Sequence, residues 1–349
     1  MTTLLFPSYP SAPDEPDAFF ADEATAAREA GFNVGFVDVE LNLGGSVHFR
    51  RLPETDTHVI YRGWILRPDD YDRMSEALDS RGLPLLESPR AYRETYEFPR
   101  WYARLRDETP RSLVIPKPCE GAHWDLGDVA EKVYETFQTR LSEKGQARRK
   151  EIQDSFSKAV AEGGMFSPNW TPEGQRLMLE LPRPCPILVK DWIKSRKSEW
   201  FEACYIPDVR DRAHTMKVIE AFIRLTEMAD LAGGLVFREF EEFERIGTHT
   251  KTRMPVINEW RCMMLHDRCF YRAPYWSDGD YQNVEAPPQS VIDRVAQAAG
   301  KLSAFWSLDL ARKPDGTWRV IEVGSGGASG VPDGGDKAAF YRALREAVG

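Results

Sequence analysis

The stretch FWSLDLARKPDGTWRVIEVG, residues 305–324, has the pattern of two strands joined by a tight turn. Asp315-Gly316 is a strong short signal for a β-hairpin with a two-residue type I′ turn. That turn would place Asp309 directly opposite Glu322, because residues that face each other across a hairpin share one side of the sheet. Two facing carboxylates repel unless a cation lies between them, and their hard oxygen atoms suit Mg²⁺ or Mn²⁺. The hairpin therefore predicts a metal site, with a solvated acidic pair or a register shifted by one residue as the alternatives.

The hairpin also predicts which residues lie on the opposite face of the sheet. In the expected register Leu308, Leu310, Ile321 and Val323 all point away from the two carboxylates. These four side chains are apolar, so this face is expected to pack in the core.

A glycine-rich segment, residues 324–330 (GSGGASG), follows the second strand directly. Glycine lets backbone N–H groups approach an anion closely, so this segment is a candidate phosphate-binding loop. A flexible connector explains the same composition equally well.

A second candidate is the basic segment KDWIKSRKS, residues 190–198. Four cations within eight positions are unusual in a chain that is acidic overall, and they could bind a polyphosphate. An exposed basic turn is the simpler interpretation, but Trp192 near its start and Trp200 just beyond its end favour a binding function. The cations are Lys190, Lys194, Arg196 and Lys197.

Charged residues also alternate with aromatic residues in FREF, residues 237–240, and in NEWR, residues 258–261. In a strand, Glu259 and Arg261 would share one face. Buried charge needs a partner, so these residues form either structural ion pairs or part of a binding site.

The order of strand and helix signals predicts an α/β fold followed by an α+β fold. Residues 3–6, 33–39, 58–61 and 83–86 look like strands, and helices are expected at 14–30 and from Pro68 to Gly82. This alternation indicates a small three-layer α/β lobe with a parallel sheet. The second half contains mainly antiparallel strands, expected at 186–190, 200–206, 235–240, 256–265 and 269–275, and then in the hairpin.

Length and composition exclude several classes of protein. The chain has 349 residues, is 42% hydrophobic and 29% charged, and carries a formal net charge of −9. These values are typical of a globular protein with more than one lobe and are unfavourable for a general nucleic-acid or membrane binder. The five cysteines are scattered without zinc spacing, and no leader peptide or 18-residue apolar run occurs, so we expect a cytoplasmic protein.

No GxSxG, GxxxxGK[ST] or HExxH motif occurs, and no histidine lies in a recognisable triad context. A protein nucleophile is therefore not indicated.

Taken together, these segments resemble the ATP-grasp superfamily. Residues 186–190 look like the strand that ends in the phosphate-contacting lysine, and 194–198 stand where the family has its phosphate loop. Residues 235–240 resemble the strand and hinge beside adenine, and the hairpin resembles the strands that carry the metal ligands. The sequence of residues 190–197 most resembles the clade that is named for one arginine and two lysines. This resemblance implies an α/β pre-ATP-grasp domain at 1–110, a linking region at 111–185 and the ATP-grasp lobes at 186–349.

The resemblance implies an ATP-dependent carboxylate–amine ligase. Such an enzyme phosphorylates a carboxylate to an acyl phosphate, which an amine or, less often, a thiol then attacks, with release of ADP and phosphate. The expected cofactors are ATP and Mg²⁺ or Mn²⁺, held by Asp309 and Glu322. Lys190 would contact the α/β-phosphates, and Lys194, Arg196 and Lys197 would cover the β/γ end.

The remaining site residues are also assigned by resemblance. Glu239 and Phe240 would line the adenine pocket, and Glu259 would accept hydrogen bonds from the ribose hydroxyls. Arg238, Arg261 and Arg272 are candidates for binding phosphate, the substrate carboxylate or the acyl phosphate.

One position departs from the family pattern. Many relatives have an asparagine two residues after the glutamate as a third metal ligand, and this chain has Gly324. Ser325 and Gly327 also stand where Asp and Gln are common.

Two other functions are alternatives. The first is a kinase-like phosphotransferase on the same fold, and the second is a non-catalytic anion-binding protein. The expected partners are small-molecule or peptide carboxylates and amines, with no nucleic acid and no membrane, and relatives in this superfamily allow for a homodimer.

Overall fold

A computed structural model describes residues 2–38, 46–54, 58–119, 121–138, 185–226, 231–251, 254–332 and 334–349. The chain divides into two compact units. Unit 1 combines Met1–Arg111 with Glu241–Gly349, and unit 2 is the continuous segment Ser112–Phe240. The expected division at 110 lies close to the first boundary. The expected division at 186 lies inside unit 2, because strand β5 (Ser112–Pro116) pairs with strand β8 (Gly234–Glu239). Most of the predicted linking region, residues 139–184, lies outside the described residues.

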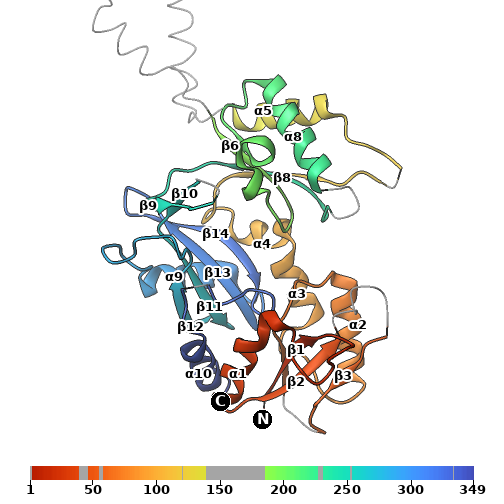
Figure 1. The fold of residues 1–349 in the computed structure, drawn as a ribbon. Coiled ribbons are helices and arrows are strands. Elements are labelled where there is room, and N and C mark those ends of the chain that lie inside the picture. Colours follow the sequence, from red (N-terminus) through yellow and green to blue (C-terminus); the bar gives the residue numbers. More distant parts are fainter. Residues whose placement is uncertain are drawn as a thin grey trace, which may run out of the picture. The chain divides into compact units, whose positions relative to one another are not determined.

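The first sheet of unit 1 has the strand order β3-β2-β1-β4. Figure 1 labels β1, β2 and β3 of this sheet. Strand β1 pairs in parallel with both β2 and β4, whereas the short β3 is antiparallel to β2. The strands are β1 (Thr2–Ser8), β2 (Asn33–Asp38), β3 (Phe49–Arg50) and β4 (His58–Tyr61). The helices of this part are η1 (Ala18–Phe20), α1 (Ala21–Glu29), α2 (Pro68–Asp79), α3 (Pro89–Tyr96) and α4 (Phe98–Leu105).

Alternation along β1 explains the layers on this sheet. Leu4 and Phe6 pack with α1 and the C-terminal helix α10 (Lys337–Val348), whereas Leu5 packs on the other face with α2. A strand buried on both faces requires helices on both sides, so the predicted three-layer α/β lobe is confirmed. Its C-terminal helix comes from the far end of the chain. Residues 83–86 form only a single bridge, Val59 with Leu85, rather than the predicted strand.

The second sheet of unit 1 is antiparallel, with the order β12-β11-β13-β14. Its strands are β11 (Glu259–Leu265), β12 (Arg268–Pro274), β13 (Phe305–Arg312) and β14 (Trp318–Ser325). A two-stranded ribbon of β9 (Arg245–Thr248) and β10 (Pro255–Ile257) precedes it, and helix α9 (Gln289–Ala299) precedes β13.

The β13–β14 hairpin has a different turn from the predicted one. Lys313 N–H donates to Thr317 O, and Gly316 N–H donates to Lys313 O, so the loop has three residues and Gly316 has a φ of +87°. A three-residue loop shifts the pairing by one position. A bulge at Ile321 shifts it back, so that Asp309 still lies opposite Glu322. Val320 therefore takes the predicted place of Ile321 opposite Leu310, and Ile321 is only half-buried.

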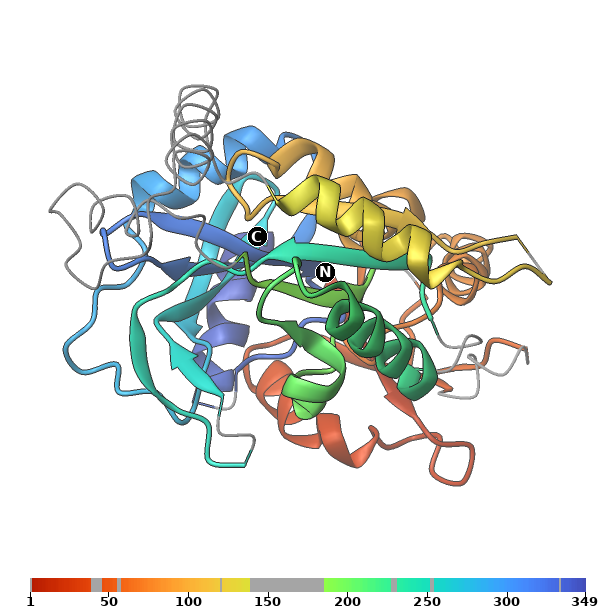
Figure 2. The same cartoon turned by 90° about the horizontal axis from the view of Figure 1, so that it is seen from above.

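Unit 2 is built on an antiparallel sheet of order β5-β8-β6-β7. Helices α5 (Leu126–Phe137) and α8 (Arg212–Thr226) pack against each other, with α5 also against β5 and α8 against β6 (Ile187–Asp191) (Figures 1 and 2). Apolar side chains of these helices and strands form one shared core. The predicted strand at 200–206 is wrong over most of its length. A short 3-10 helix (Lys197–Glu199) leads into a π-helix (Trp200–Cys204), and only Tyr205–Ile206 pair as β7.

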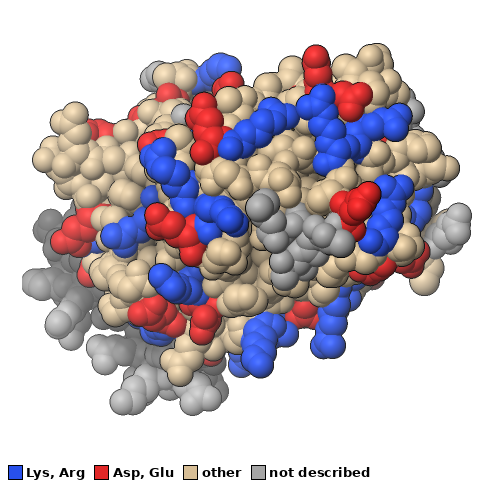
Figure 3. Space-filling view, turned by 90° about the horizontal axis from the view of Figure 1, so that it is seen from below, with Lys and Arg blue, Asp and Glu red and all other residues tan. Residues whose placement is uncertain are grey.

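No helix in the described part of the chain is long and apolar enough to cross a membrane. On the face shown in Figure 3, basic and acidic side chains are interspersed rather than gathered by sign.

Candidate functional site

Three charged side chains lie in one row across the second sheet of unit 1. Arg261 of β11 pairs with Asp309 of β13, and Asp309 pairs with Glu322 of β14. The Arg261 guanidinium donates from Nε to Asp309 Oδ1 at 2.8 Å and from Nη2 to Oδ2 at 2.7 Å. Burial alone would lower the pKa of Arg261, but the paired Asp309 carboxylate raises it above its ordinary value. The predicted juxtaposition of Asp309 and Glu322 is thus present, and Arg261 offsets part of its negative charge.

The row fits a divalent cation in chemistry and only partly in ligand number. Carboxylate oxygens are the ligands that Mg²⁺ prefers, and Glu322 is half-buried while Asp309 is 1% exposed. Among the described residues no group of three or more His, Cys, Asp or Glu side chains could hold a metal ion. Any cation here would depend on Asp309, Glu322 and non-protein oxygens such as phosphate or water.

Gly324 occupies the place where many relatives have a third ligand, and its surroundings leave little room for a side chain. A Cβ at this position would lie 2.8 Å from Ser329 Oγ and 3.0 Å from Ser307 Oγ. These two hydroxyls hydrogen-bond to each other at 2.7 Å. The space beside the row of Arg261, Asp309 and Glu322 is therefore filled by a serine pair.

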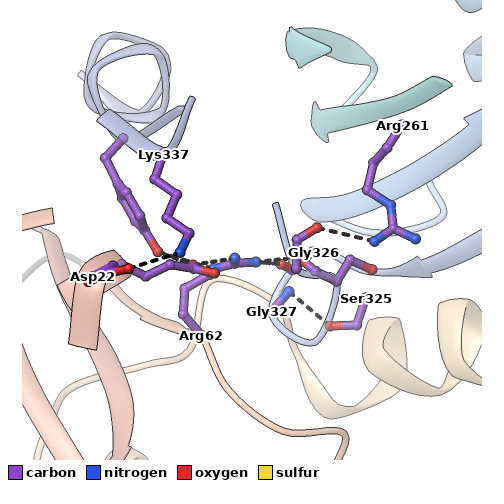
Figure 4. A network of polar contacts seen from close by, with 11 residues as sticks. Asp22, Arg62, Arg261, Ser325, Gly326, Gly327 and Lys337 are labelled. Carbon is purple, nitrogen blue, oxygen red and sulfur yellow. Dashed lines mark hydrogen bonds and ion pairs between the residues drawn. The ribbon is translucent and has the colours of Figure 1, made fainter. Parts of the chain in front are cut away.

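The glycine-rich segment 324–330 is neither an anion cradle nor a loose connector. Its backbone N–H groups at 326, 327, 328 and 329 donate to oxygens of Phe305 and Ser325 within the same unit. Its carbonyls point outward to donors instead: Arg62 donates to Gly326 O at 2.5 Å and to Ser329 O at 2.7 Å (Figure 4). Gly63 N–H donates to Gly327 O, and Arg261 donates to Gly330 O. The interpretation as a phosphate-binding loop is therefore not supported, because the N–H groups of residues 326–329 are already bonded.

Arg62 is the centre of this network and is 1% exposed. Its guanidinium also forms an ion pair with Glu23 at 2.6 Å, and Glu23 accepts a hydrogen bond from Tyr341 at 2.5 Å. Burial alone would raise the pKa of Glu23, but the Arg62 charge and the bonds from Tyr341 and Arg62 hold it below its usual value. Nearby, Lys337 pairs with Asp22 at 3.4 Å (Figure 4). Arg62 is thus a structural residue that fixes the segment, rather than a substrate ligand.

Glu87 is a second buried group beneath the same segment, and sequence reasoning missed it. Its carboxylate accepts hydrogen bonds from Ser325 Oγ at 2.5 Å and Ser303 Oγ at 2.9 Å. Burial raises the pKa of Glu87 to about 7, and the serine bonds oppose that rise only in part. No spacing or motif in the sequence marks this residue, because these two partners lie 216 and 238 positions away.

Glu259 lies on the same face as Arg261 but has its own partners. It is 2% exposed and accepts a hydrogen bond from Trp276 Nε1 at 2.8 Å. Arg261 lies over the ring of Tyr275 at 4.9 Å. Aromatic side chains of the 275–281 segment therefore lie beside both charged residues.

Arg272 is not brought to this row. It pairs with Cys262, so it points to the opposite face of the sheet from Arg261, and it donates to Pro287 O at 2.8 Å. The predicted grouping of Arg272 with the other site residues is therefore not present in the structure.

In unit 2, the basic segment begins where β6 ends. The buried Asp191 side chain accepts from Ile193 N–H at 2.6 Å and from Lys194 N–H, and a bridge joins Lys190 to Ser195. Burial raises the pKa of Asp191, and the two backbone donors oppose the rise. One carboxylate thus sets the turn that presents the cations.

The positions of the predicted unit 2 residues follow from the pairing of β6 with β8. Ile187, Val189 and Phe237 face the helices, so Lys190 and Arg238 share the opposite face. Lys194 is exposed, and Arg196 donates to Thr226 Oγ1 at 3.3 Å, with Lys197 in the following 3-10 helix.

The end of β8 carries the predicted adenine residues. Glu239 pairs with Ile187, and Phe240 follows it. The Phe240 ring lies 5.2 Å from Tyr205 and 6.1 Å from Trp200. Aromatic residues of the π-helix and of β7 are thus gathered around Phe240.

A sheet bearing basic residues and an antiparallel sheet bearing paired carboxylates, preceded by a parallel α/β lobe, define an ATP-grasp type of fold. Residues 179–344 match the model of an ATP-grasp domain, the third family of the clade that is named for one arginine and two lysines. The chain therefore contains an ATP-grasp domain, as the sequence predicted.

Two solved structures are similar over nearly the whole chain. One is a RimK domain protein ATP-grasp from Sphaerobacter thermophilus, with 12% identity, a TM-score of 0.52 and 99% of each chain covered. The other is D-cycloserine synthetase DcsG, with 14% identity, a TM-score of 0.52, and 99% of this chain and 100% of that chain covered. At these identities the likeness is one of fold. Among curated proteins, none matches.

Proposed function

We propose that this protein is an ATP-dependent carboxylate–amine ligase that works through an acyl-phosphate intermediate and releases ADP and phosphate. The observation that carries the proposal is the row of Arg261, Asp309 and Glu322 in a chain whose second half matches an ATP-grasp domain. Two acidic residues on one face of a sheet would repel an anion, so they do not fit a module that binds only an anion.

In unit 1, Asp309 and Glu322 would hold Mg²⁺, which when bound would neutralise charge on the nucleotide phosphates. Arg261 fixes the orientation of Asp309 through two hydrogen bonds. Because Asp309 is fully buried, that pair also avoids the cost of an isolated buried carboxylate.

In unit 2, the cations would bind and neutralise the phosphates. Lys190 would contact the α/β-phosphates, and Lys194, Arg196 and Lys197 would cover the β/γ end and exclude water. Arg238 shares the sheet face of Lys190 and would add a further positive charge. Glu239 and the aromatic group around Phe240 would bind adenine.

Phosphoryl transfer depends mainly on positioning and charge neutralisation, so no protein nucleophile is needed. The carboxylate substrate would accept the γ-phosphoryl group from ATP. The amine would then attack the acyl carbon and displace phosphate, forming an amide or peptide bond.

The first test is a thermal-shift titration with ATP and ADP, with and without Mg²⁺, on the wild type and on Glu322→Gln. A ligand at 100 times its dissociation constant stabilises the folded state by about 2.7 kcal/mol. We expect a Mg²⁺-dependent rise in Tm for the wild type that is lost in Glu322→Gln. The matched control is Glu346→Gln, which changes an exposed glutamate of α10 and should keep the shift.

Product analysis then separates the reaction types. Release of ADP and phosphate only when both a carboxylate and an amine are present supports ligation. A stable phosphorylated product without an amine would instead support the kinase-like alternative. Absence of any nucleotide shift would contradict both.

A further inference from the structure

Exposed large apolar side chains are concentrated at one place in unit 1. Six such side chains occur in the described part of the chain, and four of them flank β1 and β4. The four are Tyr9 (49% exposed), Phe19 (67%), Trp64 (41%) and Ile65 (42%), and we call them the aromatic platform. A cluster of exposed aromatic side chains commonly marks a binding surface.

A buried carboxylate holds the platform in place. Asp17 is 4% exposed, and it accepts hydrogen bonds from Trp64 Nε1 at 2.9 Å and from Phe19 N–H at 2.9 Å. The Asp17 charge, together with its hydrogen bond to the Tyr9 hydroxyl, raises the pKa of Tyr9. One acidic side chain therefore binds three members of a small surface.

The rings also contact one another. Phe19 lies 4.8 Å from Trp64, and the buried Phe20 meets Trp64 edge-on at 5.1 Å. Such contacts fix the ring positions before any ligand arrives, which reduces the entropy lost on binding.

The platform lies at the edge of the first sheet where parallel strands end. Tyr9 follows the last residue of β1, and Trp64 comes three residues after the end of β4. In open α/β sheets, ligands bind outside the carboxyl ends of the strands.

The charge of the segment that carries Tyr9 and Phe19 favours a cation. Residues 9–19 contain three acidic residues, Asp14, Glu15 and Asp17, and no Lys or Arg. Asp14 pairs with Arg51 at 3.5 Å, so the acidic residues of this segment outnumber that basic partner. Aromatic ring faces attract cations as well, so charge and rings select the same kind of ligand.

The openness of the platform favours a chain segment over a small molecule. Small-molecule sites enclose most of their ligand in a concave pocket. Phe19 is 67% exposed and can enclose little of a small-molecule ligand, but it can anchor an extended partner.

We infer that the aromatic platform docks a peptide segment in which Lys or Arg stands beside an apolar side chain. The cation lies on the rings of Phe19 and Trp64 near the acidic 14–17 segment, and the apolar side chain covers Ile65. This inference goes beyond the proposed ligase reaction and does not depend on nucleotide binding.

The test begins with a phage-displayed library of random peptides, panned on the full-length protein without ATP. Phe19→Ala serves for counter-selection, because Phe19 donates no side-chain hydrogen bond and its loss should leave the fold intact. We expect enrichment of Lys or Arg next to an apolar residue. Enrichment of acidic or uncharged peptides, or no enrichment, overturns the inference.

The affinity of one enriched peptide is then measured by fluorescence anisotropy. Phe19→Ala should weaken binding about threefold to fivefold, and replacing arginine with citrulline, or lysine with norleucine, should weaken it about tenfold. Phe201→Ala, which removes an exposed phenylalanine of unit 2, is the matched control and should leave binding unchanged. Equal losses of peptide affinity in Phe19→Ala and Phe201→Ala would overturn the inference. No loss of affinity when the peptide's charge is removed would also overturn it. Because no nucleotide is present, failure here leaves the ligase proposal untouched.

Discussion

The glycine-rich segment 324–330 is held by more hydrogen bonds than its composition indicates, and the basic segment 190–198 is held by fewer. The first has the composition of a flexible loop, yet its carbonyls are bound by Arg62, Gly63 and Arg261, and its N–H groups are bonded internally. The second has a strand end, a tryptophan and many long side chains, yet its turn depends mainly on the single carboxylate of Asp191.

We infer from this difference that the mobility of a segment follows from its hydrogen bonds rather than from its glycine content. A buried arginine donates several hydrogen bonds in a fixed geometry, and here it uses them on main-chain oxygens. We therefore expect the glycine-rich segment to be rigid and the basic segment to be adjustable. Substitutions in and beside the two segments test this contrast.

The largest effect is expected for Arg62→Met. This change releases the segment and leaves Glu23 buried without its partner, which typically costs about 3–5 kcal/mol. Urea unfolding measures the loss. Arg342→Met, on the exposed side of α10, is the control and should change the free energy of unfolding by less than about 0.5 kcal/mol.

Adding Glu23→Gln to Arg62→Met removes the unpaired charge and should restore part of the stability. If the double variant is no more stable than Arg62→Met, the charge argument fails and loss of packing is the cause.

The next effect concerns Glu87 and depends on pH. Its pKa is about 7 in the folded protein and near 4.5 in the unfolded chain, so the folded state binds more protons between these values. Stability should then fall as the pH rises from about 4.5 through 7, by up to about 3 kcal/mol.

Glu87→Gln keeps the shape of the protonated acid and should remove this decline. Urea unfolding at about pH 5 and about pH 8, on either side of the folded-state pKa, measures it. The free energy of unfolding of the variant should exceed that of the wild type at the higher pH and differ little from it at the lower pH. An equal difference at both pH values would contradict the assignment to Glu87.

Asp191→Ala tests the basic segment. The two N–H groups that donate to Asp191 would lose their partner, at a cost of about 1–2 kcal/mol. Trypsin should also cleave faster after Lys194 or Arg196. Asp211→Ala removes a comparable acceptor at the start of α8 and should lower stability without exposing these sites.

The smallest effect is expected for Gly324→Ala. The new Cβ would press on Ser329 Oγ and Ser307 Oγ at 2.8 and 3.0 Å, which should cost about 1 kcal/mol. In a Ser329→Ala background the cost should shrink, and a double-mutant cycle measures the coupling. Additive losses would show that the serine pair does not fill the space beside Gly324.

The sequence predicted the three-layer lobe and the pairing of Asp309 with Glu322, because alternation and a turn signal act over short distances. The ATP-grasp fold was predicted from the resemblance of several segments to that superfamily. The pairing was nevertheless reached through a turn that is not present. A three-residue loop and the bulge at Ile321 each shift the register by one residue, and the shifts cancel at Asp309. Local turn chemistry could not reveal the bulge, since it depends on packing.

Other features could not be read from the sequence at all. Glu23, Arg62 and Tyr341 form one buried group although they lie up to 318 positions apart. A π-helix at 200–204 is present where a strand was predicted, since the aromatic and small residues of this segment fit both a strand pattern and a helix pattern. Such contacts are set by tertiary structure, which local propensity does not encode.

The division of the chain has a consequence for synthesis on the ribosome. Unit 2 is one continuous segment, so all of its strands and helices have been made once residue 240 is translated. Unit 1 begins earlier but needs its last helix, since Phe6 and Phe20 pack against Phe340 and Tyr341. We therefore expect the inserted unit to fold first during translation. The face of β1 that packs against α10 would stay uncovered until α10 has been made, so the nascent N-terminal lobe should depend on chaperones.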